Sequence, residues 1–288
     1  MKFTKMQGAG NDFVVVETSD TRRDWAKTAI AVCDRHFGIG ADGLLLVMPS
    51  EVADFRMRIF NADGSEAAAC GNGIRCLVKY FVDNRLGKQE NHTVSVETMA
   101  GVRKAEFFKV AGKVAKVKIG MGEPRFEAKE VPVIMGQNEG PIVDIKSMMD
   151  YPISVNGLKL RLNLVSMGNP HAVYFLQEQV AHFPLSNIGP RVEQNRIFPK
   201  GVNFEIVQVV NRQQIDARVW EHGVGETLAC GSGACAIAVA AQLRGYADDK
   251  VQIRLPGGEL EIEWDGAGEV FLTGPAETVF TGEWLEKN

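Results

Sequence analysis

The sequence predicts a mixed α/β (α+β) fold of two pseudo-symmetric domains, each a strand-rich, barrel-like sheet around a central helix. Three observations predict this fold. The pentapeptide ACGNG at residues 69–73 recurs as ACGSG at residues 229–233. Short stretches rich in β-branched and aromatic residues precede each copy. Directly after each copy, the apolar residues change to a helical spacing.

The repeat extends beyond the pentapeptide. A shift of 160 residues places Cys70 on Cys230 and Arg58 on Arg218. With small changes of register, AGNDFVVVE matches MGNPHAVYF and GADGLLLV matches GVNFEIVQV. These two matches pair Asn11 with Asn169 and Asp42 with Asn203. Because there are only two copies, we infer a duplicated domain and not a solenoid.

The expected elements follow in chain order. We expect strands over residues 2–7, 12–18, 42–48, 54–61, 93–100, 102–108 and 114–120. The first central helix is expected from residue 70, with Gly87 as its C-terminal stop. The second is expected from residue 230 to Gly245. Its residues are apolar on nearly every side, so it should be buried.

The domain boundaries are expected at residues 1–122 and 123–273. Residues 122–132, GEPRFEAKEVP, are interpreted as the linker. The tail at about residues 274–288 should finish the fold, and its return to the first domain is left open.

Composition excludes several classes of protein. The net charge of −4 argues against a nucleic-acid-binding surface. The apolar runs are too short to span a bilayer, and the N-terminus lacks the apolar region of a signal peptide. We therefore expect a cytoplasmic protein without membrane or nucleic-acid partners.

The cysteine pattern argues against a disulfide framework and against a zinc knuckle. The count of five is odd. The spacing of Cys70 from Cys76, and of Cys230 from Cys235, is not that of a zinc knuckle. We expect no metal and no cofactor, and we interpret Cys33, Cys76 and Cys235 as structural.

Cys70 and Cys230 each stand at the start of an expected helix. The first amides of a helix and its dipole favour an anion such as a carboxylate. The same field should lower the pKa of a thiol. If the two helix starts face each other, the thiols flank the carbon bonded to that carboxylate. One can then remove a proton while the other delivers one to the opposite face, as in a racemase or epimerase.

Five motifs carry a resemblance to a known family: FTKMQGAGNDFVVV, DRHFGIGADGLLLV, FNADGSEAAACGNGIRC, SMGNPHAV and GETLACGSGACA. In this order they resemble diaminopimelate epimerase over nearly the whole chain. The resemblance implies an isomerase, usually a homodimer, that needs neither pyridoxal phosphate nor metal. It implies interconversion of LL- and meso-diaminopimelate by two cysteines, in the biosynthesis of lysine and peptidoglycan precursors.

The resemblance also implies roles for individual residues. Cys70 and Cys230 match the acid/base pair, and Gly71, Asn72, Gly231 and Ser232 match the cradle of the reacting carboxylate. The positions that match holders of the far end and the amines of the substrate are Asn11, Asn61, Asn169 and Asn203. Glu221 matches a residue that contacts the ammonium and supports a thiol, and His171 matches a histidine beside the cysteines. By residue type alone, these asparagines could be turn formers, Glu221 a solvated strand end and His171 a core histidine.

Two departures from the family pattern concern the substrate. His222 stands where the family usually has an arginine that grips the non-reacting carboxylate, and Gly43 stands where many members have glutamine. A histidine is shorter and lacks the bidentate fork of arginine. A two-cysteine racemase of another amino acid, such as histidine, therefore remains the alternative.

Three other classes of protein are alternatives. A pyridoxal-phosphate racemase needs a Schiff-base lysine and a phosphate cup, and neither pattern is evident. GAGND leads into a strand, whereas a dinucleotide-binding turn opens a helix. A non-catalytic module that binds amino acids would bind the substrate without exchanging its α-proton.

Overall fold

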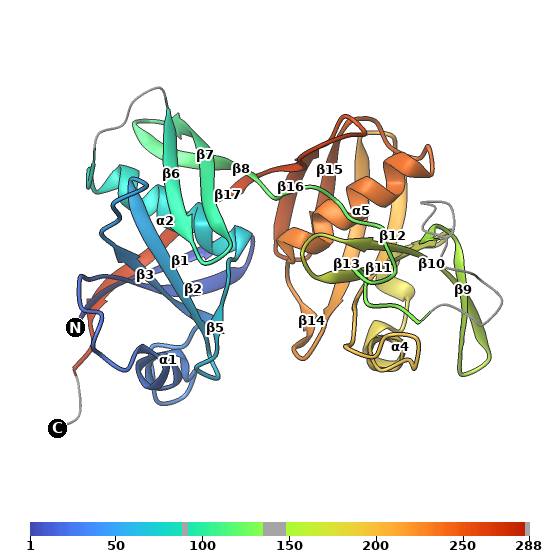
Figure 1. Cartoon of the computed structure of the whole chain (residues 1–288), viewed down its shortest axis with the longest axis horizontal. Helices are drawn as coiled ribbons and strands as arrows, with labels where there is room; N and C mark the ends of the chain where they lie inside the picture. The colour runs from blue at the N-terminus through green and yellow to red at the C-terminus, as the bar shows by residue number, and fades with distance from the viewer. Residues whose placement is uncertain (88–91, 135–147, 286–288) are drawn as a thin grey trace. The chain divides into compact units, whose positions relative to one another are not determined.

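The computed structural model describes residues 1–87, 92–134 and 148–285 and divides into two compact units. Unit 1 comprises Met1–Gly120 and Thr273–Asn288, and unit 2 comprises Met121–Leu272. Parts of the expected second domain (135–147) and of the expected tail (286–288) lie outside the described residues. Both units combine helices with a larger share of strands, which confirms the mixed α/β class (Figure 1).

Unit 1 contains the helices α1 (Trp25–Cys33) and α2 (Gly71–Asp83). Its strands are β1 (Lys2–Gly8), β2 (Asn11–Glu17), β3 (Gly43–Met48), β4 (Phe55–Asn61), β5 (Glu66–Ala67), β6 (Thr93–Thr98), β7 (Gly101–Val110), β8 (Lys113–Gly120) and β18 (Glu277–Glu283). Strand β17 (Phe271–Pro275) begins in unit 2 and ends in unit 1. The expected strands of the first half are thus all present.

The strands of unit 1 form one continuous series of pairs. β1 runs antiparallel to β2, β2 runs parallel to β3, and β3 runs antiparallel to β4. β4 then pairs in parallel with β6, which continues antiparallel to β7 and β8. At the two ends of the series, β18 pairs with β1 and β17 pairs with β8. The C-terminal segment therefore contacts both edges of the sheet against which α2 packs.

Unit 2 contains α4 (Leu185–Glu193), α5 (Gly231–Leu243) and the 3₁₀ helix η1 (Val180–His182). Its strands are β9 (Tyr151–Val155), β10 (Leu158–Ser166), β11 (Pro170–Leu176), β12 (Asn203–Asn211), β13 (Gln214–Glu221), β14 (Gly225–Thr227), β15 (Lys250–Leu255) and β16 (Gly258–Glu263).

The pairings of unit 2 repeat those of unit 1. β10 and β11 are antiparallel, β11 and β12 are parallel, and β12 and β13 are antiparallel. β13 pairs with β14 in a short hairpin and in parallel with β15, which pairs with β16. In each unit the buried helix follows the short hairpin strand, as the repeated sequence order predicts.

The strand register corrects one detail of the sequence repeat. Phe13 pairs with Gly43 between β2 and β3, and His171 pairs with Asn203 between β11 and β12. Asn203 therefore takes the place of Gly43 in the repeat, and the expected match with Asp42 is wrong by one residue. Asp42 lies immediately before β3, at the entrance of the strand.

The two central helices begin where expected but end differently. Helix α5 ends at Leu243, and Gly245 follows in the left-handed region with φ of 73°, which confirms the expected stop. Helix α2 ends at Asp83, and Arg85 adopts a φ of 57°, so the stop expected at Gly87 is wrong. Gly87 instead packs on Phe81, whose ring would lie 2.5 Å from an added Cβ.

Helices α1 and α4 were not among the expected elements. Helix α1 begins after Asp24, whose side chain accepts a hydrogen bond from the amide of Lys27. Helix α4 contains Gly189 and Pro190, two residues that usually disfavour a helix interior. An added Cβ at Gly189 would lie 2.6 Å from the ring of Trp220, so tertiary packing requires glycine there.

The segment interpreted as a linker is part of unit 2. Arg125 and Ser166 exchange backbone hydrogen bonds of 2.8 Å, and Val131 is fully buried in the core of this unit. The linker interpretation is therefore wrong, because these residues pack as a strand bridge and a core segment.

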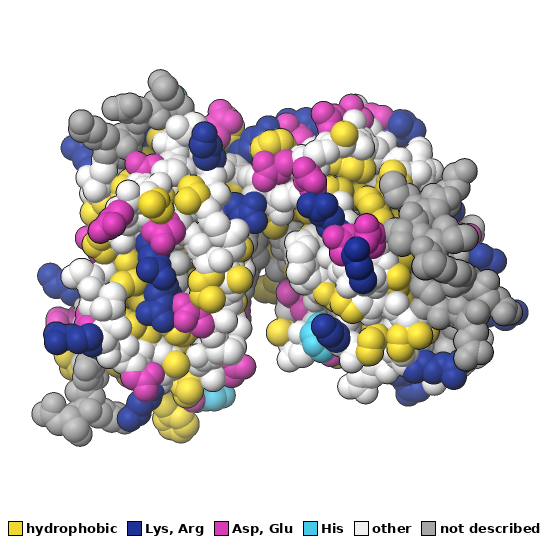
Figure 2. Space-filling view, in the orientation of Figure 1, with side chains coloured by type: hydrophobic (Ala, Val, Ile, Leu, Met, Phe, Trp, Pro, Cys, Tyr) yellow, Lys and Arg dark blue, Asp and Glu magenta, His cyan; other side chains and the backbone are white. Residues whose placement is uncertain are grey.

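The surface carries charges of both signs. On the face drawn in Figure 2, the Lys and Arg side chains are interspersed with Asp and Glu side chains. Within the described ranges, the structure contains no helix that could cross a membrane.

Candidate active site

Cys70 lies at the N-terminus of α2. Its backbone is extended, with φ of −146° and ψ of 120°, and its carbonyl accepts the first helical hydrogen bond, 2.8 Å from the amide of Ile74. Gly71 and Asn72 form the start of the helix, where the amides have no partner within the helix. This part of unit 1 can therefore offer amide donors to an anion beside a thiol.

The carboxamide of Asn11 lies beside Cys70. Its Oδ1 accepts a hydrogen bond from Asn72 Nδ2 at 3.1 Å and lies 4.0 Å from Cys70 Sγ. Its Nδ2 donates to Asp42 Oδ2 at 2.7 Å. Cys70, Asn11 and Asn72, three residues selected from the sequence, are thus brought together, and Asp42 joins them.

A charged network holds Asp42 in place. Arg35 Nη2 lies 2.8 Å from Oδ1 of both Asp12 and Asp42, and Lys5 Nζ lies 2.5 Å from Asp12 Oδ2. Burial raises the pKa of Asp12, but the hydrogen bonds from Arg35 and Lys5 outweigh it and lower that pKa to about 2. Lys5, Asp12 and Arg35 were not predicted from the sequence, and Asp42 was predicted only as a member of the repeat.

Asn61 occupies the end of β4. Its Nδ2 donates to Ser65 Oγ at 2.9 Å, and its backbone amide donates to the carbonyl of Ser65 at 2.8 Å. In this state Asn61 shapes the turn between β4 and β5, as asparagine often does.

Cys230 occupies the matching position at the N-terminus of α5. Its backbone is extended, with φ of −120° and ψ of 118°, and its Sγ lies 3.5 Å from Ser232 Oγ. The residue is 6% exposed. Gly231 and Ser232 form the start of this helix, as Gly71 and Asn72 do in unit 1.

The expected lowering of the thiol pKa is wrong for Cys230. Burial raises its pKa well above the usual value, and the nearby carboxylate of Glu221 raises it further. The Ser232 hydroxyl and the Gly233 amide lower the pKa but do not compensate. Desolvation of the thiolate outweighs the field of the helix N-terminus, so Cys230 is a thiol in this state.

Glu221 contacts Cys230 from the end of β13. Its Oε1 accepts a hydrogen bond from Thr227 Oγ1 at 2.5 Å. Burial raises the pKa of Glu221 above the usual range, although the hydrogen bonds from Thr227 and Cys230 act in the opposite direction. Glu221 is therefore buried beside the Cys230 thiol and is not a solvated strand end.

His171 is fully buried between two acceptors. Its Nδ1 lies 2.6 Å from Glu205 Oε1, and its Nε2 lies 3.0 Å from Asn169 Oδ1. Glu205 is also fully buried, and among the described residues its Oε2 has no hydrogen-bond partner. An added Cβ at Gly233 would lie 2.9 Å from Glu205 Oε1, so this carboxylate lies under the first turn of α5.

Glu205 was not among the site residues predicted from the sequence. A charged residue inside the apolar strand NFEIV was the available signal, because carboxylates are rarely fully buried without a partner.

Asn203 and His222 adjoin the residues just described, because Asn203 pairs with His171 between β11 and β12 and His222 directly follows Glu221. The Oδ1 of Asn203 accepts a hydrogen bond from the His222 amide at 3.0 Å, and its Nδ2 donates to the carbonyl of Pro170 at 2.8 Å. The His222 ring donates from Nδ1 to Glu193 Oε1 at 2.9 Å. Both residues selected from the sequence therefore organise the end of β13.

His222 borders a surface hollow of about 530 Å³. The basic residues Arg196 and Lys200 line it together with Glu193. The Trp220 Nε1 and the Gly223 amide also donate to Glu193, at 2.7 and 3.0 Å. Burial raises the pKa of Glu193, but these hydrogen bonds outweigh it and lower that pKa.

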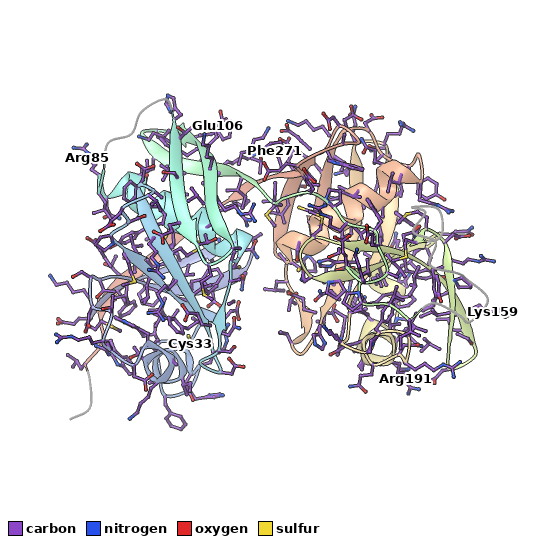
Figure 3. The ribbon with its side chains drawn as sticks, in the orientation of Figure 1. Cys33, Arg85, Glu106, Lys159, Arg191 and Phe271 are labelled. Carbon is purple, nitrogen blue, oxygen red and sulfur yellow. The ribbon has the colours of Figure 1, made fainter. Side chains whose placement is uncertain are left out.

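The other cysteines are packed in the two units. Burial raises the pKa of Cys33 and of Cys76 to about 12, and Cys235 is fully buried in α5. Cys33 lies at the end of α1 (Figure 3). None of the five cysteines, all of which lie in the described part of the chain, forms a disulfide. The described residues also contain no cluster of His, Cys, Asp and Glu that could hold a metal ion.

Comparison with known proteins gives consistent matches over the whole chain. The family model described as diaminopimelate epimerase matches residues 3–127 and 163–279. The diaminopimelate epimerase of Moorella thermoacetica is 47% identical over 287 residues, which cover 99% of each chain. Those of Acetivibrio thermocellus and Methanococcus maripaludis are 46% and 45% identical, covering 98% of this chain and 98% and 99% of theirs.

Solved structures with lower sequence identity share the fold. A probable proline racemase from Agrobacterium radiobacter superposes with a TM-score of 0.70 at 17% identity, covering 99% of this chain and 93% of that one. A PhzF-family phenazine biosynthesis protein from Bacillus anthracis gives the same TM-score and identity, covering 99% of both chains. A hydroxyproline epimerase from Agrobacterium vitis gives 0.68 at 16% identity, covering 98% and 91%.

Proposed function

Because the chain belongs to the diaminopimelate epimerase family, we propose that it interconverts LL- and meso-diaminopimelate. It does so without a cofactor, by moving the α-proton between two cysteines. This isomerase activity belongs to the biosynthesis of lysine and of peptidoglycan precursors.

One observation carries the proposal. Cys70 and Cys230 are each the residue before the first turn of a buried helix, after the same order of strands in two units. A thiol beside the amides of a helix start can exchange a proton at a carbon whose carboxylate those amides bind. The two-base mechanism of inversion uses such a group on each face of the α-carbon.

The reaction balances with these two thiols. A thiolate removes the α-proton and becomes a thiol, while the electron pair of the C–H bond delocalises into the carboxylate. The second thiol delivers its proton to the opposite face and becomes a thiolate. The amides of Gly71, Asn72, Gly231 and Ser232 stabilise the charge that develops on the carboxylate.

We assign the remaining polar residues to supporting roles. Glu221 holds the Cys230 thiol and contacts the substrate ammonium. The carboxamides of Asn11, Asn61, Asn169 and Asn203 bind the amines and the far end of the substrate. His171 acts beside the cysteines through Asn169, to which it is hydrogen-bonded.

The repeated order of strand pairs supports a finer description of the fold. We propose that the units are pseudo-symmetric copies of one duplicated domain, each a barrel-like sheet around α2 or α5. We also propose that the protein acts in the cytoplasm as a homodimer. On β18, Val279 and Phe280 are 57% and 47% exposed, and burying them between copies would be favourable. Light scattering would test the dimer.

The alternative function is racemisation of another amino acid, such as histidine. The observation that favours it is His222 in place of the family arginine. The His222 ring is paired with Glu193, so it offers only its Nε2 to a substrate. A substrate without a second carboxylate would not need an arginine at this position.

The test is a comparison of substrates by the purified, reduced protein. Chiral chromatography would follow LL-diaminopimelate, meso-diaminopimelate and L-histidine. We expect interconversion of the two diaminopimelates and no D-histidine. Racemisation of histidine alone would support the alternative, and inactivity on all three would leave a non-catalytic binding module.

A further inference from the structure

We infer that Asp42 is a positioning residue that, through Asn11, sets the orientation of the two carboxamides beside Cys70. The inference rests on the proposed function for its importance to turnover, and on the geometry of unit 1 for the contact itself. Asp42 contacts Asn11, and Asn11 faces Cys70, so we infer that Asp42 acts through Asn11.

The chemistry of Asp42 decides which way the Asn11 carboxamide points. A carboxylate only accepts hydrogen bonds, so the 2.7 Å contact between Asp42 Oδ2 and Asn11 must come from the amide nitrogen. Asn11 Oδ1 is then directed to Asn72 Nδ2 at 3.1 Å and toward Cys70 Sγ at 4.0 Å. A rotation of the amide by 180° would place oxygen against the carboxylate and lose these contacts.

Asp42 is itself held by its surroundings. The parallel register of Phe13 with Gly43 brings Asp42 beside Asp12, and their backbones are joined by a hydrogen bond of 2.9 Å. Asp42 Oδ2 also accepts from the Asp12 amide at 3.1 Å, and its Oδ1 accepts from Arg35 at 2.8 Å. Both oxygens therefore have donors, and the carboxylate has a defined orientation although its side chain is 43% exposed.

The repeat shows that this arrangement is particular to unit 1. The strand register makes Gly43 the counterpart of Asn203, so Asp42 matches the apolar Val202. In unit 2 the carboxamide of Asn169 contacts His171 instead. The two halves therefore orient their matching asparagines with different groups, Asp42 in unit 1 and the His171–Glu205 pair in unit 2.

The orientation has a consequence for the thiol. A carboxamide oxygen accepts a hydrogen bond from S–H, which favours the neutral thiol over the thiolate. An amide nitrogen would donate to the thiolate and favour it. Asp42 therefore keeps Cys70 less reactive as a nucleophile than it would be beside a freely rotating amide.

The experiment measures alkylation of Cys70 by iodoacetamide, followed by mass spectrometry of its peptide at one fixed pH. In Asp42→Asn, the anionic anchor is lost and the Asn11 amide can rotate. We expect Cys70 to react roughly fivefold faster, which corresponds to one hydrogen bond of ordinary strength. The matched control is Asp54→Asn, an exposed aspartate at the other end of β4 from Asn61 that contacts Ser95.

A double variant tests whether an oxygen that again faces Cys70 slows alkylation. In Asn11→Asp combined with Asp42→Asn, the new amide donates to the new carboxylate, and an oxygen again faces Cys70. Alkylation should return to the wild-type rate or below it, because a carboxylate also disfavours a thiolate. Thermal unfolding of each variant confirms that the compared proteins are folded.

The outcomes separate the inference from the proposed function. Faster alkylation in Asp42→Asn, reversed in the double variant, supports the inference whether or not the protein turns over diaminopimelate. If the wild type is active, kcat/KM should also fall about fivefold in Asp42→Asn, because the Asn11 carboxamide that binds the substrate loses its fixed orientation. Alkylation within twofold of the wild-type rate in Asp42→Asn would overturn the inference, while inactivity of the wild type would overturn only the proposed function.

Discussion

His171 and Glu205 form a fully buried pair beneath the first turn of α5. The His171 Nδ1 lies 2.6 Å from Glu205 Oε1, and neither side chain is exposed. On its other side the ring faces the Asn169 carboxamide oxygen at 3.0 Å. The ring therefore lies between two oxygen acceptors in the interior of unit 2. The pair therefore links the stability of unit 2 to the position of Asn169.

Removing the carboxylate should destabilise the protein strongly. Glu205→Ala leaves His171 buried without its partner, which typically costs roughly 3–5 kcal/mol of unfolding free energy. Urea denaturation would measure the loss, with the exposed Glu259→Ala as control, for which we expect less than about 0.5 kcal/mol. If Glu205→Ala cost no more than the control, the pair would not support unit 2.

Glu221 should show a conflict between activity and stability. Its pKa is raised by burial, so the folded state binds its proton more tightly than the unfolded state does. Ionisation therefore costs stability as the pH rises from the usual range of glutamate through the raised pKa. Glu221→Gln avoids this cost, so we expect the variant to gain stability over the wild type at pH 7 but little at pH 4.

The same substitution should reduce turnover. A hydrogen bond to a charged group is worth roughly 1.5–3 kcal/mol, so losing that of Glu221 should lower activity about tenfold or more. Urea denaturation at both pH values and the epimerisation rate measure the two effects. A variant less stable than the wild type at pH 7 would contradict this account.

The five cysteines should differ widely in reactivity. Cys70 is partly exposed, whereas burial raises the pKa of Cys33 and Cys76 to about 12 and that of Cys230 well above its usual value. Only the thiolate reacts with iodoacetamide, so the native protein should be modified first at Cys70. Peptide mapping would show the order, and in urea all five should react. Early modification of Cys33 or Cys76 would be inconsistent with their packing.

Gly201 should be essential for the position of His222. It adopts a φ of 71°, and an added Cβ would lie 2.3 Å from the His222 ring. Gly201→Ala should therefore move this ring from Glu193, in addition to a backbone cost of about 1 kcal/mol or more. We expect a larger loss of unfolding free energy than in Gly245→Ala, and a raised KM for diaminopimelate.

Gly245 is a matched control, because its φ is 73° and, apart from its chain neighbours, no atom of the described residues lies within 4 Å of an added Cβ. It therefore carries the same backbone cost without the contact. Equal losses in the two variants would mean that the His222 ring moves aside freely.

Local sequence patterns predicted much of the fold. In the strands of the first half, apolar residues either alternate with polar ones or follow one another without interruption, which predicts strands. Helices α2 and α5 begin at the glycines that follow Cys70 and Cys230. Helix α4 was missed because Gly189 and Pro190 oppose helix propensity, while the contact of Gly189 with Trp220 is tertiary and has no local signal. The residues 122–132 were misread because charged residues conceal the buried Val131.

The site residues likewise include some that local sequence patterns predicted and some that depend on tertiary structure. The cysteines were found because their motif is repeated. Asp42 was treated only as a member of the repeat, since its contact with Asn11 depends on the register of two parallel strands. The pKa of Cys230 was misjudged because burial of its side chain, which a sequence does not display, outweighs the helix start.

The most direct test of the two-cysteine mechanism is solvent deuterium incorporation during epimerisation of LL-diaminopimelate in D₂O, followed by NMR under reducing conditions. With two thiols on opposite faces, the meso product should carry deuterium at the inverted carbon from the first turnovers, before deuterium appears in the remaining substrate. Cys70→Ala and Cys230→Ala should each abolish product formation, and Cys235→Ala should retain it. Product that keeps the original proton, or epimerisation by either single variant, would contradict the mechanism.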